Sequence, residues 1–152
     1  MEGDWGSGEG QLRLDDPEEW DAAFERGEAG LGTAVIGLAL HCSLAEVSPR
    51  IVMAMRLPDA GQRGFAFTAV GHAARLNGEL SPELYAALRA EGPGGIAEHP
   101  NRDTLTFVPF RKLPPWFKRR WVYVAVRDKL QSWWLRCAYA VEDARRAVRG
   151  RS

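Results

Sequence analysis

The residues of this sequence best suited to bind a metal ion or to act in covalent catalysis are two histidines and one cysteine. His41 and Cys42 are adjacent, and His72 follows 31 residues later. A metal site needs three or four ligands, and no clear fourth ligand accompanies these three. Cys42 and a histidine could act as nucleophile and base, but no third group is evident that would orient the base. We expect the three side chains to serve helix packing, with no metal site and no catalytic site.

The second feature that could do acid–base chemistry is the pair of carboxylates on each side of Pro17. Asp15 and Asp16 precede the proline, and Glu18 and Glu19 follow it. Carboxylates stabilise the positive N-terminal end of a helix, which explains this cluster without a reaction. The sequence also lacks the phosphate-binding, zinc-protease and serine-hydrolase motifs. It therefore predicts a protein that is not an enzyme and that has no cofactor.

The C-terminal third combines basic and aromatic residues. Residues 101–152 hold 13 basic and 4 acidic residues, a net charge of +9, whereas residues 1–50 have a net charge of −8. Aromatic residues beside arginine are typical of protein interfaces, and the same combination can contact phosphates and stack on bases. The core of a capping helix, overlaid by arginine side chains, is the third interpretation. The residues that we expect to contact a partner are Lys112, Trp116, Lys118, Arg119, Arg120, Arg127, Trp134 and Arg136.

Two adjacent tryptophans restrict how this C-terminal segment can pack. Trp133 and Trp134 point about 100° apart if the segment is helical. Both are buried only if two sides of the helix are covered. One of them is therefore a candidate for exposure or for the contact surface of a dimer.

The elements that carry these residues are predicted by repeated helix-start patterns. Asp16-Pro17, Ser48-Pro49 and Ser81-Pro82 each place a short polar capping residue before a proline, which suits the first helical position. The last two are 33 residues apart, and Leu113-Pro114-Pro115 follows after the same interval. We expect helices over residues 17–26, 31–43, 49–57, 61–76, 82–91 and 115–148.

These elements predict an all-α fold of stacked antiparallel helical hairpins with a long C-terminal helix. Hairpins in series that cannot bury their apolar faces alone stack into an α-solenoid. The final helix carries an apolar stripe from Val122 to Val148, and its length suggests a bend or a break. Residues 92–113 are predicted to be an irregular loop, although the 33-residue interval would place a helix there. Residues 1–14 are predicted to be flexible.

Size and composition fit one domain over residues 1–152. The 152 residues include two cysteines, Cys42 and Cys137, far apart and without a disulfide pattern. No signal peptide is evident, and the longest apolar stretch, residues 31–40, is too short to span a bilayer. We therefore expect a cytoplasmic protein without membrane contact.

A short motif resembles a known family. Residues 71–78 (Gly-His-Ala-Ala-Arg-Leu-Asn-Gly), preceded by residues 63–67, are similar to the Gly-His-x-Ala-Arg helix of small bacterial HEAT-like repeat proteins. Residues 37–41, an apolar helix ending in His41, also resemble those proteins. The resemblance covers residues 31–91 and implies an α-solenoid, with an immunity-like or other protein-interaction role.

We thus expect a protein-binding helical-repeat module, an immunity-like or regulatory adaptor in bacteria, whose partner is an acidic protein. The alternative is a nucleic-acid-associated protein that uses the basic, aromatic C-terminal helix. The sequence leaves the oligomeric state open.

Overall fold

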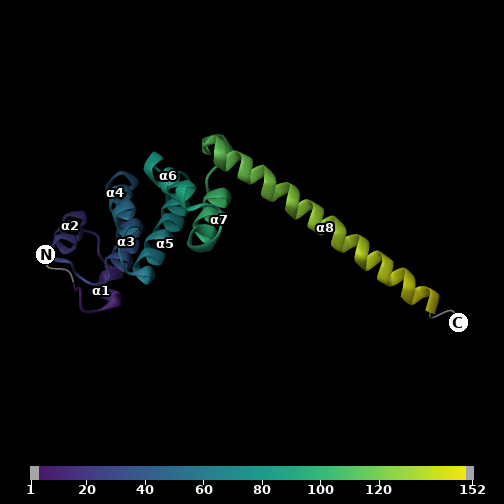
Figure 1. Cartoon of the computed structure of the whole chain (residues 1–152), viewed down its shortest axis with the longest axis horizontal. Coiled ribbons are helices and arrows are strands. Elements are labelled where there is room, and N and C mark those ends of the chain that lie inside the picture. Colours follow the sequence, from purple (N-terminus) through teal and green to yellow (C-terminus); the bar gives the residue numbers. More distant parts are fainter. Residues whose placement is uncertain (1–3, 150–152) are drawn as a thin grey trace. The chain divides into compact units, whose positions relative to one another are not determined.

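Residues 4–149 are described by a computed structural model, which is all-helical and has no strand in that range. Figure 1 shows the helices in chain order. Their bounds are α1 Gly8–Leu12, α2 Pro17–Arg26, α3 Leu31–His41, α4 Leu44–Ala54, α5 Ala60–Asn77, α6 Pro82–Glu91, α7 Glu98–Phe107 and α8 Pro115–Arg149, with short 3-10 helices η1 Gly95–Ala97 and η2 Phe110–Lys112.

The chain, expected to form one domain, divides into two units. The first unit is Met1–Pro114 and the second is Pro115–Ser152, which holds α8. In the first unit α3 packs against α1 and α5, and α5 packs against α7. A second row is formed by α2, α4 and α6, in which α4 contacts both neighbours as well as α3 and α5.

The core of the first unit lies around α3, and small residues let its neighbours approach closely. Eight of the eleven α3 residues are buried. A Cβ atom added at Gly32 would lie 2.1 Å from the main-chain oxygen of Gln62 on α5, and one at Gly37 would lie 2.8 Å from that of Gln11 on α1. The helices therefore meet backbone to backbone at these positions, and close packing of the flanking side chains supplies the core.

Three of the four predicted proline starts, at Pro17, Pro82 and Pro115, are confirmed. Asp16 caps α2 by accepting from the main-chain N–H groups of Glu18 and Glu19, and Ser81 caps α6 by accepting from that of Leu84. Pro17 and Pro82 are the first residues of these helices, whose bounds match the predicted 17–26 and 82–91.

The helix start predicted at Ser48-Pro49 is wrong, because a stronger cap lies upstream. Ser43 and Glu46 form a capping box in which each side chain accepts from the main-chain N–H of the other residue. Helix α4 therefore begins at Leu44, and Pro49 lies inside it. Ser48 is buried, and its hydroxyl donates to the carbonyl oxygen of Leu44 at 2.5 Å.

A Ser43→Ala variant is expected to lose about 1 kcal/mol of its free energy of unfolding, because α4 loses its N-cap. The hydrogen bonds from Ser43 to the Glu46 carboxylate lower the pKa of that carboxylate. A carboxylate whose pKa is lowered by folding stabilises the fold at every pH above its ordinary pKa. This contribution disappears as the pH falls below about 4. The difference between wild type and variant in urea unfolding should therefore shrink from pH 7 to pH 3. A difference independent of pH would contradict the role of Glu46.

The loop predicted over residues 92–113 is also wrong, because α7 and two 3-10 turns occupy most of it. Thr104 and Thr106 suggested extended structure, but each hydroxyl donates to the carbonyl four residues earlier, on Pro100 and Arg102, at 2.7 and 2.8 Å. Packing on α5 then stabilises the helix. The 33-residue interval, which placed a helix here, was the better guide.

The remaining expectations concern the two ends of the described chain. Within the segment predicted to be flexible, residues 8–12 form α1 and Leu14 is buried; residues 1–3 lie outside the described range. The C-terminal helix, predicted over 115–148, runs from Pro115 to Arg149 as one helix of 35 residues, without the expected break.

Candidate functional site

Two of the three residues considered for metal binding or covalent catalysis, His41 and Cys42, have separate hydrogen-bond partners, and the third, His72, is half-buried on α5. His41 Nδ1 lies 2.8 Å from the carbonyl oxygen of Gly37, one turn earlier on α3, and Cys42 Sγ donates to the carbonyl oxygen of Asp15 at 3.3 Å. Burial, followed by the nearby Glu46 and Asp15 carboxylates, raises the pKa of the Cys42 thiol, which lowers the fraction of reactive thiolate at neutral pH. Between residues 4 and 149, no group of three or more His, Cys, Asp or Glu side chains is placed to hold a metal ion.

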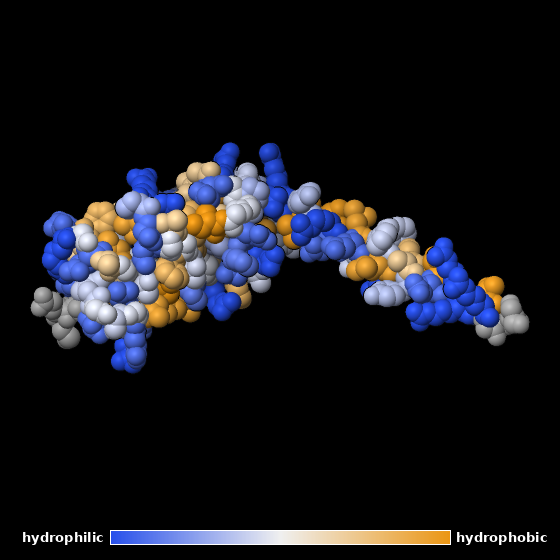
Figure 2. Space-filling view, turned by 60° about the horizontal axis from the view of Figure 1, so that its bottom comes forward, coloured by the Kyte–Doolittle hydropathy of each residue, from blue (hydrophilic) through white to orange (hydrophobic). Residues whose placement is uncertain are grey.

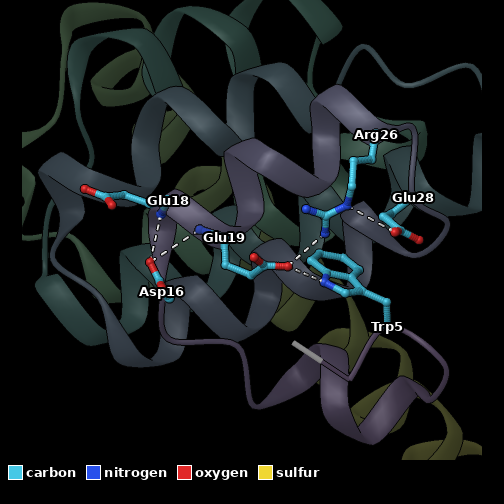
Figure 3. A network of polar contacts seen from close by, with 6 residues as sticks. All are labelled: Trp5, Asp16, Glu18, Glu19, Arg26 and Glu28. Carbon is cyan, nitrogen blue, oxygen red and sulfur yellow. Dashed lines mark hydrogen bonds and ion pairs between the residues drawn. The ribbon is translucent and has the colours of Figure 1, made fainter. Parts of the chain in front are cut away.

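Two of the carboxylates around Pro17, those of Asp16 and Glu19, have structural roles at α2 (Figure 3). Asp16 Oδ1 accepts from the N–H groups of Glu18 and Glu19 at 3.0 and 3.4 Å. The Glu19 carboxylate accepts from Trp5 Nε1 at 2.8 Å and from Arg26 at 2.9 Å. The cluster thus caps α2 and ties the N-terminal segment to it, and the Glu19 hydrogen bond raises the pKa of Arg26.

A cavity of about 510 Å³ in the first unit was not predicted from the sequence. It lies between the α2–α3 turn, where Gly27 and Gly30 have positive φ, and the α4–α5 turn at Leu57-Pro58-Asp59. The acidic groups at the cavity are engaged, because Glu28 pairs with Arg26 and Asp59 accepts from Gln62 N–H at 2.7 Å. The cavity therefore offers an apolar surface without a candidate acid, base or nucleophile. The glycine and proline residues indicate the two turns in the sequence. The sequence does not indicate that these turns lie side by side and enclose a cavity.

Of the eight residues expected to contact a partner, one belongs to the first unit. Lys112 lies in η2 of the first unit, where its Nζ is 3.0 Å from Glu79 Oε2. The other seven lie on α8. Successive residues of an α-helix are about 100° apart, so Trp116, Arg120, Arg127 and Trp134 share one side of α8. Lys118 and Arg136 lie roughly opposite, and Arg119 between the two groups.

Four of these seven residues lie in the first turns of α8. We call Trp116, Lys118, Arg119 and Arg120 the basic segment. Its Arg120 guanidinium carbon lies 5.3 Å from the ring centroid of Tyr123, a cation–π contact along the helix. The second unit has 10 basic and 3 acidic residues, a net charge of +7, whereas the first unit has 10 basic and 17 acidic residues, a net charge of −7. The boundary between the units is therefore also a boundary of charge.

Beyond the basic segment, α8 exposes a long apolar face. Trp133 and Trp134 are 66% and 67% exposed, and Leu130 is 61% exposed. Figure 2 shows this hydrophobic surface between charged surface along α8. Exposed apolar surface of this extent indicates an interaction surface. The sequence identified the stripe, but it did not show that the stripe is uncovered.

In the part of the chain that the structure describes, no helix has the length and apolar character needed to cross a membrane.

No protein-family model, curated protein or solved structure shows a significant match to this chain.

Proposed function

We propose that this protein is a protein-binding helical-repeat module of the HEAT-like α-solenoid type, which binds an acidic protein through the basic segment of α8. An immunity-like or regulatory adaptor role in the bacterial cytoplasm, without catalytic activity, fits this proposal best. The observation that carries it is the separation of charge, +7 on the second unit against −7 on the first. Such asymmetry directs a partner of one sign to one part of the molecule.

The packing of the first unit supports the repeat architecture. Helices α3, α5 and α7 contact each other in chain order, and α4 contacts α6 in the second row. Stacked hairpins produce such contacts between successive helices of each row. This architecture provides an ordered scaffold, and α8 adds a helix with exposed apolar and basic side chains.

The geometry of the basic segment favours a protein over a nucleic acid. Lys118, Arg119 and Arg120 are consecutive, so they point in three directions around the helix. Arg119 is exposed, and Lys118 and Arg120 are half-buried. A phosphate backbone needs several cations along one face, whereas an acidic protein can contact single cations that point in different directions. The nucleic-acid alternative predicts binding at low salt that falls steeply as salt is added. We expect no binding of duplex DNA or of single-stranded RNA at low salt.

The proposal is tested by capturing partners from the native cell with the tagged full-length protein and with an Arg119→Glu/Arg120→Glu variant. We expect the wild type to retain a protein of acidic isoelectric point, and the variant to lose it by at least about tenfold. Arg145→Glu/Arg146→Glu is the matched control, because it makes the same charge change on the same helix and should keep the partner. Equal capture by all three proteins would overturn the proposed surface.

A further inference from the structure

Helix α8 carries an apolar seam with the spacing of a helix–helix contact. From Tyr123 to Ala147, every position at alternating intervals of three and four residues is apolar. This spacing averages 3.5 residues and keeps one line of side chains facing a partner helix. The seam residues are Tyr123, Val126, Leu130, Trp133, Cys137, Ala140, Ala144 and Ala147, and all eight are exposed.

The sizes of the seam residues change along the helix. The four N-terminal positions hold large side chains, which are 51–66% exposed, and the four C-terminal positions hold a cysteine and three alanines. Two parallel copies would place Trp133 against Trp133 and leave gaps where Ala144 meets Ala144. Two antiparallel copies place a large side chain opposite a small one in every layer, which fills the contact evenly. The layers pair Tyr123 with Ala147, Val126 with Ala144, Leu130 with Ala140, and Trp133 with Cys137 of the second copy.

The residues beside the seam fit the same arrangement. On one flank Lys129 comes opposite Asp143 of the second copy, and this ion pair occurs twice by symmetry. On the other flank Trp134 meets Trp134 of the second copy near the two-fold axis. The unfavourable contact is Arg136 with Arg136 of the second copy, which costs little because solvent screens exposed charges.

We propose that α8 forms a homodimer by antiparallel pairing of residues 123–147 with the same residues of a second copy. The two-fold axis crosses the helix pair at the level of Leu135, whose side chain points away from the seam. The pairing buries the apolar face that the single chain exposes, and it gives Trp134 a place in the dimer contact. The basic segment precedes the seam and stays outside it. The dimer therefore presents two basic segments about 50 Å apart along the helix pair, which allows bivalent binding of an acidic partner.

The first test is the mass of the full-length protein in solution, by light scattering and sedimentation, at concentrations up to about 0.1 mM. We expect a dimer for the wild type. Trp133→Glu should raise the dissociation constant at least about 100-fold, because it puts a charge in the central layers. Leu135→Glu, an equally drastic change on the outer side of the same helix, should leave the dimer intact. The proposal would be overturned if the wild type were a monomer, even one that binds anionic lipid vesicles. Equal effects of the two variants on the dimer would also overturn it.

A swap of seam residues tests whether the occupant is a second copy. Leu130→Ala should weaken the dimer, because the layer with Ala140 loses its large side chain. Leu130→Ala combined with Ala140→Leu restores one large and one small residue in that layer, so dimerisation should recover. Failure of the double variant to recover would exclude this pairing. Thermal unfolding of the first unit should be unchanged in every variant, which separates the loss of pairing from the loss of the fold.

Disulfide formation tests the direction of the pairing. In a Cys42→Ser/Cys137→Ser background, Leu130→Cys with Ala140→Cys should give a covalent dimer under mild oxidation, since these positions share a layer. With Cys42→Ser alone, Cys137 faces Trp133 of the second copy and should not cross-link. Rapid cross-linking through Cys137 would indicate parallel pairing and overturn the proposal.

The Arg119→Glu/Arg120→Glu variant should dimerise like the wild type. Loss of the acidic partner and loss of the dimer are therefore separate results.

Discussion

A Gly32→Ala variant is expected to lose about 3 kcal/mol or more of its free energy of unfolding. The new Cβ atom would lie 2.1 Å from the main-chain oxygen of Gln62, closer than any real contact allows. A main-chain atom inside α5 cannot rotate away, so α3 and α5 must move apart. The strain exceeds the gain of about 1 kcal/mol that alanine normally brings to a helix.

The same displacement would also break the cap of α3. Gly30, the residue before this helix, has no side chain with which to cap it. The Gln62 side chain performs this role from α5, because its Oε1 accepts from the N–H groups of Gly32 and Thr33 at 2.8 and 3.2 Å. Separation of the two helices leaves these donors without a partner, which adds to the loss.

Gly64→Ala is the matched control for Gly32→Ala. Gly64 is also a helical glycine, but a Cβ atom there would meet only the Ile96 side chain, at 4.0 Å. We expect this variant to be as stable as the wild type or more stable by up to about 1 kcal/mol. Urea unfolding followed by circular dichroism measures both variants. A wild-type midpoint for Gly32→Ala would show that the α3–α5 contact tolerates a methyl group.

The local chemistry of helix starts explains which elements could be predicted from the sequence. Asp16-Pro17 and Ser81-Pro82 contain both the capping side chain and the proline, so the starts of α2 and α6 depend on neighbouring residues alone. At Ser48-Pro49 the same pattern was misleading, because Ser43 and Glu46 cap the chain five residues earlier. Their three-residue spacing is itself a sequence pattern, and giving it more weight than the proline would have located α4.

Tertiary contacts explain what could not be predicted. Helix α7 has β-branched and glycine-rich surroundings that favour a loop, and its contact with α5 outweighs those preferences. Asn101 also ties α7 to the end of α6, since its side-chain amide donates to the carbonyl oxygen of Gly92 at 2.8 Å. The sequence does not show which segments meet, and the cavity between two distant turns was missed for the same reason.

The candidate site was predicted in composition but not in arrangement. Seven of the eight residues that the sequence proposed as partner contacts lie on one helix, α8, and their contact with a partner stays a prediction. It did not show that Lys112 is paired with Glu79, or that the apolar seam is uncovered. Spacing predicts which residues share a side of a helix, whereas exposure depends on whether another element covers that side.

Trp20→Ala is expected to lose about 4 kcal/mol of the free energy of unfolding of the first unit. Trp20 is fully buried on α2, and its ring is stacked on Phe24 with the centroids 5.4 Å apart. Its Nε1 donates to the carbonyl oxygen of Leu31, at the start of α3, at 3.1 Å. Removing the indole therefore leaves a cavity and breaks a direct tie between α2 and α3. Trp20→Phe keeps most of the apolar contact and should lose about 1–2 kcal/mol.

Hydrogen exchange can show where the stability is lost. Because Trp20 joins α2 to α3, amide protection should fall in these two helices, while amides of α8, in the second unit, should exchange as in the wild type. Trp5→Phe is the matched control: Trp5 is half-buried and donates to Glu19 near the surface, so its replacement should cost less than about 1 kcal/mol. If Trp20→Ala were no more destabilising than Trp5→Phe, α2 would not be part of the core that holds α3. If α8 lost protection together with α2 and α3, the two units would unfold as one.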